Sequence, residues 1–193
     1  MKKLIFATHN INKVKEVRNQ LMGTYEVLGL NDIGFHEEII EDKKTIVENS
    51  ISKVRFVKER TGYDCFADDT GLEVSALNGK PGVFSKRFAG QNASSDDNIN
   101  KLLNMLKGKL DRSAQFKTVI SLFNNGEIQI FEGICKGNIG FKRSGNFGFG
   151  YDPIFIAENK NISFGQMSLE EKNKIAHRAR AVNKLIDYLT NLY

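Results

Sequence analysis

Two adjacent carboxylates, Asp68 and Asp69, directly follow the apolar segment 65–67 and precede Thr70 and Gly71. The apolar run is typical of a buried strand, and the glycine predicts a turn that ends it. Such a turn would lift both acids from the end of a sheet, where ligands of α/β proteins bind. Because neighbouring carboxylates repel, we expect a cation such as Mg²⁺, or a shared proton, to neutralise them. An acidic turn without a catalytic role is the alternative that the pair alone leaves open.

A second polar segment, residues 8–13, lies between an expected strand over residues 3–7 and an expected helix over residues 12–21. The free N–H groups and the positive dipole end of that helix would face the segment. Its hydroxyl, amide and ammonium groups suit phosphate oxygens, although the glycine-rich P-loop pattern is absent. The alternative is an ordinary helix cap with a surface lysine. The segment consists of Thr8, His9, Asn10, Ile11, Asn12 and Lys13.

Thr45 and Glu48 match a capping box, which predicts a helix that runs to about residue 60. On this helix Asn49 and Lys53 are four residues apart and share a face. Lys53 is therefore a candidate second cation for phosphates, and a surface lysine is the other interpretation. Glu41, in an acidic loop over residues 37–44, is a candidate metal ligand.

Residues 145–153 alternate three glycines with aromatic residues. Such a backbone lets a flat ligand approach closely, and Phe149 or Tyr151 could stack on a base. An aromatic turn that feeds the core is the alternative. Lys172 and the pair His177–Arg178 add further hydrogen-bond donors, and a surface pair is the alternative for them.

The remaining pattern predicts a strand over residues 25–30, a helix over 95–106 and a hairpin of strands 116–123 and 127–135 around Asn124-Asn125-Gly126. A capping box at Ser168–Glu171 predicts a helix that continues towards Leu192. Strands that alternate with helices, followed by a hairpin, indicate an α/β fold with a mixed sheet. We expect one domain over residues 1–193.

The net charge of +5 suits an anionic ligand. The two cysteines, Cys65 and Cys135, lie in apolar segments, which indicates buried thiols in a reducing compartment. The sequence shows neither a signal peptide nor an apolar run of about 18 residues. We expect a cytoplasmic protein that does not associate with membranes.

Taken together and in order, these motifs resemble the inosine triphosphate pyrophosphatase family, the non-canonical purine nucleoside triphosphate pyrophosphatases. The resemblance covers essentially the whole chain, through residues 8–13, 48–53, 67–72, 77–85, 148–153, 171–173 and 177–178. It implies an elongated α/β fold whose long, twisted mixed sheet and flanking helices form two lobes around a nucleotide cleft. It also implies a homodimer that hydrolyses ITP, dITP or XTP to the monophosphate and pyrophosphate with Mg²⁺.

The chemistry of the candidate residues suggests a role for each of them in that reaction. Glu41 and Asp69 would hold Mg²⁺, and Asp69 or, as the alternative, Asp68 would deprotonate the attacking water. Phosphates would contact residues 8–13, Lys53, Lys172 and the Thr70 hydroxyl. Phe149 would stack on the base beside Gly150, Tyr151 and Asp152. His177 and Arg178 would recognise the group at position 6 of the purine ring. Hypoxanthine and xanthine carry an oxygen there, whereas adenine carries an amino group.

Four residues depart from the family pattern, namely His9 for Gly, Thr70 for Ser, Gln166 for Glu and Ala176 for Ser. These changes bear on substrate preference more than on the reaction. Two other functions remain: a pyrimidine-directed pyrophosphatase of the septum-formation inhibitor type, and a non-catalytic nucleic-acid-binding module. Residues 149–152 and 177–178 argue against the first. The acidic pair argues against the second, because carboxylates without a metal repel a phosphate backbone, so we expect no stable nucleic-acid partner.

Overall fold

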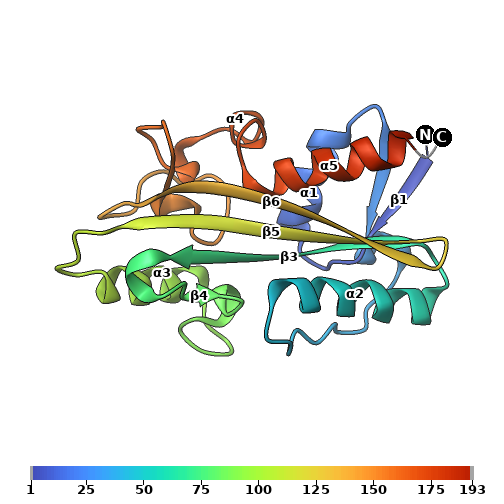
Figure 1. Ribbon diagram of the computed structural model, residues 1–193, viewed down its shortest axis with the longest axis horizontal. Helices are drawn as coiled ribbons and strands as arrows, with labels where there is room; N and C mark the ends of the chain where they lie inside the picture. The colour runs from blue at the N-terminus through green and yellow to red at the C-terminus, as the bar shows by residue number, and fades with distance from the viewer. Residues whose placement is uncertain (1, 192–193) are drawn as a thin grey trace. The chain divides into compact units, whose positions relative to one another are not determined.

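The computed structural model describes residues 2–191, which form one mixed sheet with flanking helices (Figure 1). The strands are β1 (Lys2–Phe6), β2 (Tyr25–Gly29), β3 (Cys65–Val74), β4 (Pro81–Gly82), β5 (Ser113–Asn124), β6 (Glu127–Ile139) and β7 (Phe155–Ala157). The helices are α1 (Ile11–Leu21), α2 (Ile46–Thr61), α3 (Ser95–Met105), α4 (Leu169–Asn173) and α5 (His177–Asn191). The strand order is β2-β1-β3-β5-β6-β7, with β4 beside β3. Parallel pairs at β1 and antiparallel pairs at β4 and β7 confirm the predicted mixed α/β sheet.

The chain divides into two compact units. Unit 1 contains the described residues up to 69, residues 118–133 and the described residues from 178 onward, and unit 2 contains residues 70–117 and 134–177. Strands β3, β5 and β6 each contribute residues to both units. The single domain over residues 1–193 stays a prediction.

In unit 1 the strands bury both of their faces. Leu4 and Phe6 of β1 join a core with α1 and α5, whereas Ile5 packs in a second core with Val54 and Val57 of α2. Figure 1 shows α2 on one side of these strands and α1 and α5 on the other. This arrangement follows from the alternation of side chains along a strand, which sends successive residues to opposite faces. The buried residues of β1 and of the first half of β3 thereby alternate between the two helix layers.

Strand β3 does not end at Gly71, so the predicted turn there is wrong. The strand continues to Val74 because Leu72 and Val74 are fully buried in the core of unit 2. The backbone N–H of Leu72 is also held by the Ser85 hydroxyl, at 2.8 Å. Asp68 and Asp69 therefore lie in the middle of a strand and not in a turn at its end.

Unit 2 is built around a core to which α3, β5 and β6 contribute Leu102, Phe116 and Cys135. The hairpin prediction is confirmed, with strands longer than expected. Its turn residues Asn125 and Gly126 have φ angles of 50° and 86°, the left-handed conformation that a two-residue hairpin turn requires. Cys65 and Cys135 are buried free thiols, as predicted. Within residues 2–191, no helix has the length and apolar character needed to cross a membrane.

The C-terminal helix is interrupted, contrary to the prediction of one helix from Ser168 towards Leu192. The predicted capping box at Ser168 is present, but α4 ends at Asn173 and α5 begins at His177. The two helices belong to different cores: α4 buries Lys172 in unit 2, whereas α5 buries Val182 and Leu185 in unit 1. The break is where the chain passes from one core to the other.

The predicted capping box of α2 is present, and it fixes the start of the helix that carries Asn49 and Lys53. Thr45 Oγ1 accepts the Glu48 N–H at 3.1 Å, and Glu48 Oε2 accepts the Thr45 N–H at 3.1 Å. We expect Thr45→Ala to lower the free energy of unfolding by about 1 kcal/mol, because the Glu48 N–H loses its side-chain acceptor. Urea denaturation measures this change, with Lys44→Ala, an exposed neighbour outside the box, as the control. Equal losses for both variants would contradict the assignment.

Candidate active site

Asp68 is a fully buried anion held by two cations in unit 1. It shares the strand face of Phe66, and that face meets α1 and α5. Lys13 of α1 donates to Asp68 Oδ1 at 2.7 Å, and Arg178 of α5 donates its Nε–H to Asp68 Oδ2 at 2.9 Å. A second carboxylate, Glu16, accepts from Nη1 of Arg178. The result is a buried chain of four alternating charges.

These contacts keep Asp68 ionised. Burial alone would raise the pKa of the Asp68 carboxyl, but Lys13 and Arg178 together hold this pKa well below its usual range. Burial also acts on the guanidinium, yet Asp68 and Glu16 raise the pKa of Arg178 above its ordinary value. Burial lowers the pKa of Lys13, and Asp68 opposes this effect. Asp68 is therefore a permanent anion and a poor proton acceptor.

Asp69 points to the opposite face, toward α2, and has different partners. Asn49 donates its amide to Asp69 Oδ2 at 3.1 Å, and Lys53 Nζ lies 3.4 Å from Asp69 Oδ1. Burial raises the pKa of the Asp69 carboxyl, and Lys53 offsets this only in part. Asp69 is therefore the better proton acceptor of the two carboxylates.

The two carboxylates are each paired with a separate lysine, and the Mg²⁺ expected from their adjacency stays a prediction. Side-chain alternation places them on opposite faces of β3, so each has its own lysine. Their mutual repulsion is reduced by this separation and by the three cations around them, Lys13, Lys53 and Arg178.

Glu41 joins the Asp69 side of this cluster. Its Oε1 atom lies 2.5 Å from Lys53 Nζ, so Glu41 and Asp69 both reach the same ammonium. Two convergent carboxylates suit a hard divalent ion that also takes oxygens from phosphates. Residues 2–191 contain no group of three or more His, Cys, Asp or Glu side chains placed to hold a metal.

The polar turn before α1 is organised by Asn10. Its Oδ1 atom accepts the N–H groups of Asn12 and Lys13 at 3.0 and 3.3 Å, and its own N–H donates to Thr8 Oγ1 at 3.2 Å. The cap therefore already uses two of the helix N–H groups expected to face a phosphate. His9 is bonded to Asn31 and to the backbone carbonyl of Glu37. Ile11 is 60% exposed at the first position of the helix.

In unit 2, Asp152 links the aromatic loop to α4. Its Oδ2 atom accepts the Phe149 N–H at 2.8 Å and the Lys172 ammonium at 2.5 Å. Lys172 Nζ also lies 5.1 Å from the ring centroid of Phe149, a cation–π distance. Gly148 is needed here because a Cβ on it would lie 2.0 Å from Asp152 Oδ2. Lys172 is thus bound to the loop that is expected to contact the purine base.

The other predicted residues of unit 2 surround the same loop or lie near its core. Tyr151 is buried and donates its hydroxyl to the Ser85 carbonyl at 2.9 Å, so it anchors the loop. Gly150 has a φ of 60°. The His177 ring is buried and stacks on Phe116 with 4.4 Å between centroids. Thr70, half-buried, is the first residue of unit 2 after Asp69.

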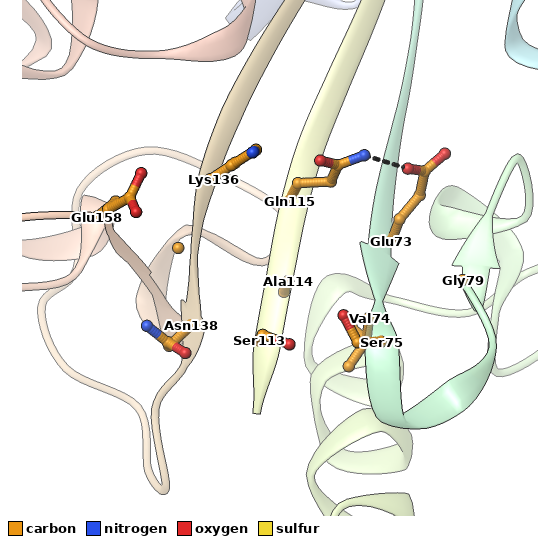
Figure 2. Close-up of a pocket in the computed structure, with 11 residues that line it drawn as sticks. Glu73, Val74, Ser75, Gly79, Ser113, Ala114, Gln115, Lys136, Asn138 and Glu158 are labelled. Carbon is orange, nitrogen blue, oxygen red and sulfur yellow. Dashed lines mark hydrogen bonds between the residues drawn. The ribbon is translucent and has the colours of Figure 1, made fainter. Parts of the chain in front are cut away.

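A hollow of about 590 Å³ lies elsewhere in unit 2, over strands β3, β5 and β6 (Figure 2). Its polar side chains include Lys136 and Glu158, and Glu73 accepts a hydrogen bond of 2.7 Å from Gln115. None of the residues that line it is a sequence-predicted site residue. Its lining mixes both charge signs and gives no sign of a particular ligand.

Glu16 is not among the predicted site residues, and Asn49 stands out in the sequence only as a neighbour of Lys53. Glu16 follows Lys13 by three residues, so both lie on one face of α1, and Val17 beside it is fully buried. A charged residue on the apolar face of a helix is the signal that points to a buried ion pair. Asn49 is an uncharged polar residue that is almost fully buried on α2, and its position points in the same way to a buried hydrogen bond.

Removal of the Asp68 charge would leave Lys13 and Arg178 buried without their shared counter-ion. We expect Asp68→Asn to lower the free energy of unfolding at neutral pH by about 3–5 kcal/mol. The matched control is Asp64→Asn, which breaks the half-exposed Lys58–Asp64 pair and should cost at most about 1 kcal/mol. Chemical denaturation of both variants measures the difference. Similar losses of unfolding free energy in the two variants would contradict the prediction that the buried ion pairs of Asp68 stabilise the fold more than the half-exposed pair does.

The chain matches the Ham1 family over residues 4–188, which confirms the resemblance inferred from the motifs. It is 52% identical over 188 residues to a protein of Flavobacterium psychrophilum named dITP/XTP pyrophosphatase, covering 97% of this chain and 99% of the relative. A Bacillus subtilis protein of the same name is 43% identical, covering 96% of each chain. The solved Staphylococcus aureus Ham1 protein has a TM-score of 0.88 at 37% identity, with both chains fully covered. This chain belongs to the Ham1 family.

Proposed function

We propose that this chain hydrolyses the non-canonical purine nucleoside triphosphates dITP, XTP and ITP to the monophosphate and pyrophosphate. Its full-length relatives carry the name dITP/XTP pyrophosphatase at 42–52% identity. The observation that carries the proposal is the pair of adjacent aspartates on opposite faces of β3, with a lysine beside each. This pair supplies both a fixed anion and a proton acceptor. Neither the pyrimidine-directed enzyme nor the nucleic-acid-binding module is favoured.

Asp69 is the proposed general base. Its raised pKa brings it closer to neutrality, which favours proton transfer from an attacking water. Asn49 and Lys53 fix its two oxygens, so the carboxylate is oriented before substrate binds. Asp68 serves a different purpose: it positions Lys13 and Arg178 and remains ionised.

The charged groups of unit 1 are the proposed phosphate ligands, with Thr8, Asn10, Lys13 and Lys53 as the principal donors. His9, Ile11 and Asn12 shape the same turn, and Thr70 adds a hydroxyl. Glu41 and Asp69 fit a divalent ion, proposed to be Mg²⁺, which when bound would neutralise charge on the triphosphate. Ordered cations of this kind stabilise the charge that develops during phosphoryl transfer.

Base recognition is assigned to residues of the aromatic loop. Phe149 is the proposed stacking face, held by Asp152 and Lys172, with Gly150 and Tyr151 as its support. Because Lys172 is paired with Asp152, we assign it to base recognition in place of the phosphate role that the motifs suggested. His177 and Arg178 remain the proposed readers of position 6. A cytoplasmic homodimer is part of the same proposal.

The proposed specificity predicts metal-dependent pyrophosphate release. With Mg²⁺, turnover of dITP, XTP and ITP should exceed that of ATP by about 100-fold or more, because the 6-amino group of adenine leaves the buried donors that read position 6 unpaired. GTP shares the 6-oxo group, so we expect its lower turnover to come from its 2-amino group. A chelator should abolish release. Assays of pyrophosphate release from all five nucleotides, with and without Mg²⁺, test both the metal dependence and the substrate preference.

The control for that assay is Asp69→Asn, which keeps the size of the side chain and removes the proposed base. It should lower kcat by about 100-fold or more and leave nucleotide binding in place. Equal turnover of all five nucleotides by the wild type would contradict the assigned specificity. Full activity of Asp69→Asn would exclude Asp69 as the base.

The stacking role of Phe149 can be separated from general effects on its loop. We expect Phe149→Ala to raise the KM for dITP by about 5- to 100-fold, since a base–aromatic stack contributes about 1–3 kcal/mol. The matched control is Phe147→Ala, because Phe147 lies in the same loop and is 62% exposed. Steady-state kinetics of both variants test this. A larger effect at Phe147 would transfer the stacking role to that residue.

A further inference from the structure

Lys53 is unusual among lysines within helices because its ammonium is buried. It lies midway along α2, 4% exposed, where an amphipathic helix would normally place a lysine in solvent. An ammonium has three donors, and Lys53 Nζ has three oxygens around it. These are the Asp68 carbonyl at 2.9 Å, Glu41 Oε1 at 2.5 Å and Asp69 Oδ1 at 3.4 Å. All three donors are thereby directed into one small cluster of oxygens.

The same two carboxylates are those that suit a divalent ion. Glu41 and Asp69 come from different segments and converge on the position of the Lys53 ammonium. A divalent ion between them would lie against a buried positive charge. At such short separations in a poorly solvated site, two cations repel strongly. Full coordination of an ion by both carboxylates therefore requires Lys53 to give up at least one of these contacts.

We propose that the Lys53 ammonium and a divalent cation compete for Glu41 and Asp69. This inference rests on the proposed function, which assigns these carboxylates to the ion. The Asp68 carbonyl lies outside the competition, so it can retain the ammonium when the two carboxylates are released. Phosphate oxygens of a nucleotide then offer Lys53 replacement acceptors. The ion consequently binds weakly to the protein alone and tightly together with a triphosphate.

The competition can be measured without catalysis. Mn²⁺, whose free form is quantified by its paramagnetic resonance signal, is titrated into nucleotide-free wild-type protein and into Lys53→Met. We expect Lys53→Met to bind Mn²⁺ about tenfold more tightly or better, because no buried ammonium has to be displaced.

Lys13→Met is the matched control for simple charge repulsion. Lys13 belongs to the same charge cluster, but its ammonium donates to Asp68 and not to the proposed metal ligands. If the competition is correct, Lys13→Met should gain less than about threefold in Mn²⁺ affinity, because the charge it removes does not contact the proposed metal ligands. An equal gain for both variants would overturn the competition, and so would equal or weaker Mn²⁺ binding by Lys53→Met.

A measurement on the wild type keeps the proposal testable if Lys53→Met does not fold. The ¹⁵N resonance of the Lys53 ammonium is followed during a titration with Mg²⁺. We expect it to shift with the same midpoint as Mg²⁺ binding, and an unchanged resonance at saturation would overturn the proposal.

Pyrophosphate release from dITP by the wild type is recorded separately. If the wild type releases no pyrophosphate from dITP, the proposed function is refuted. If the wild type is active but Lys53→Met binds Mn²⁺ no more tightly than the wild type, only the competition is refuted.

Discussion

The alternation of side chains along β3 is the constraint on which the site depends. Asp68 and Asp69 are neighbours in sequence, yet the pleat of the strand turns them to opposite faces. One face meets α1 and α5, and the other meets α2. Each carboxylate consequently obtains its own cation from its own helix layer, Lys13 for Asp68 and Lys53 for Asp69. A single register shift of β3 would exchange these partners.

This separation gives two identical side chains different chemistry. The Lys13 and Arg178 charges hold the pKa of Asp68 down, whereas burial holds the pKa of Asp69 up. Asp68 thereby becomes a structural anion that secures two helices to the sheet. Asp69 becomes a candidate base that is already oriented by Asn49. Pairs of titratable groups whose surroundings shift their pKa values in opposite directions can take different roles in acid–base chemistry.

Local signals in the sequence predicted the elements well, because they act over a few residues. The capping boxes at Thr45 and Ser168 and the turn at Asn125-Gly126 are present as expected. The course of β3 past Gly71 was not predictable in this way, since it depends on burial of Leu72 in a distant core. The interruption of the C-terminal helix before His177 and the pairing of Asp152 with Lys172 were not predictable for the same reason. These features arise from packing between segments far apart in the chain.

The different states of Asp68 and Asp69 form the central claim, and nuclear magnetic resonance titration tests it most directly. Protein with ¹³C-labelled aspartate carboxyl groups is titrated with acid, and the two resonances are assigned with Asp68→Asn and Asp69→Asn. The account predicts that Asp69 protonates above its ordinary pKa of about 3.9 and that Asp68 stays ionised well below it. Protonation of Asp68 at the same pH as Asp69, or at a higher one, would contradict the account.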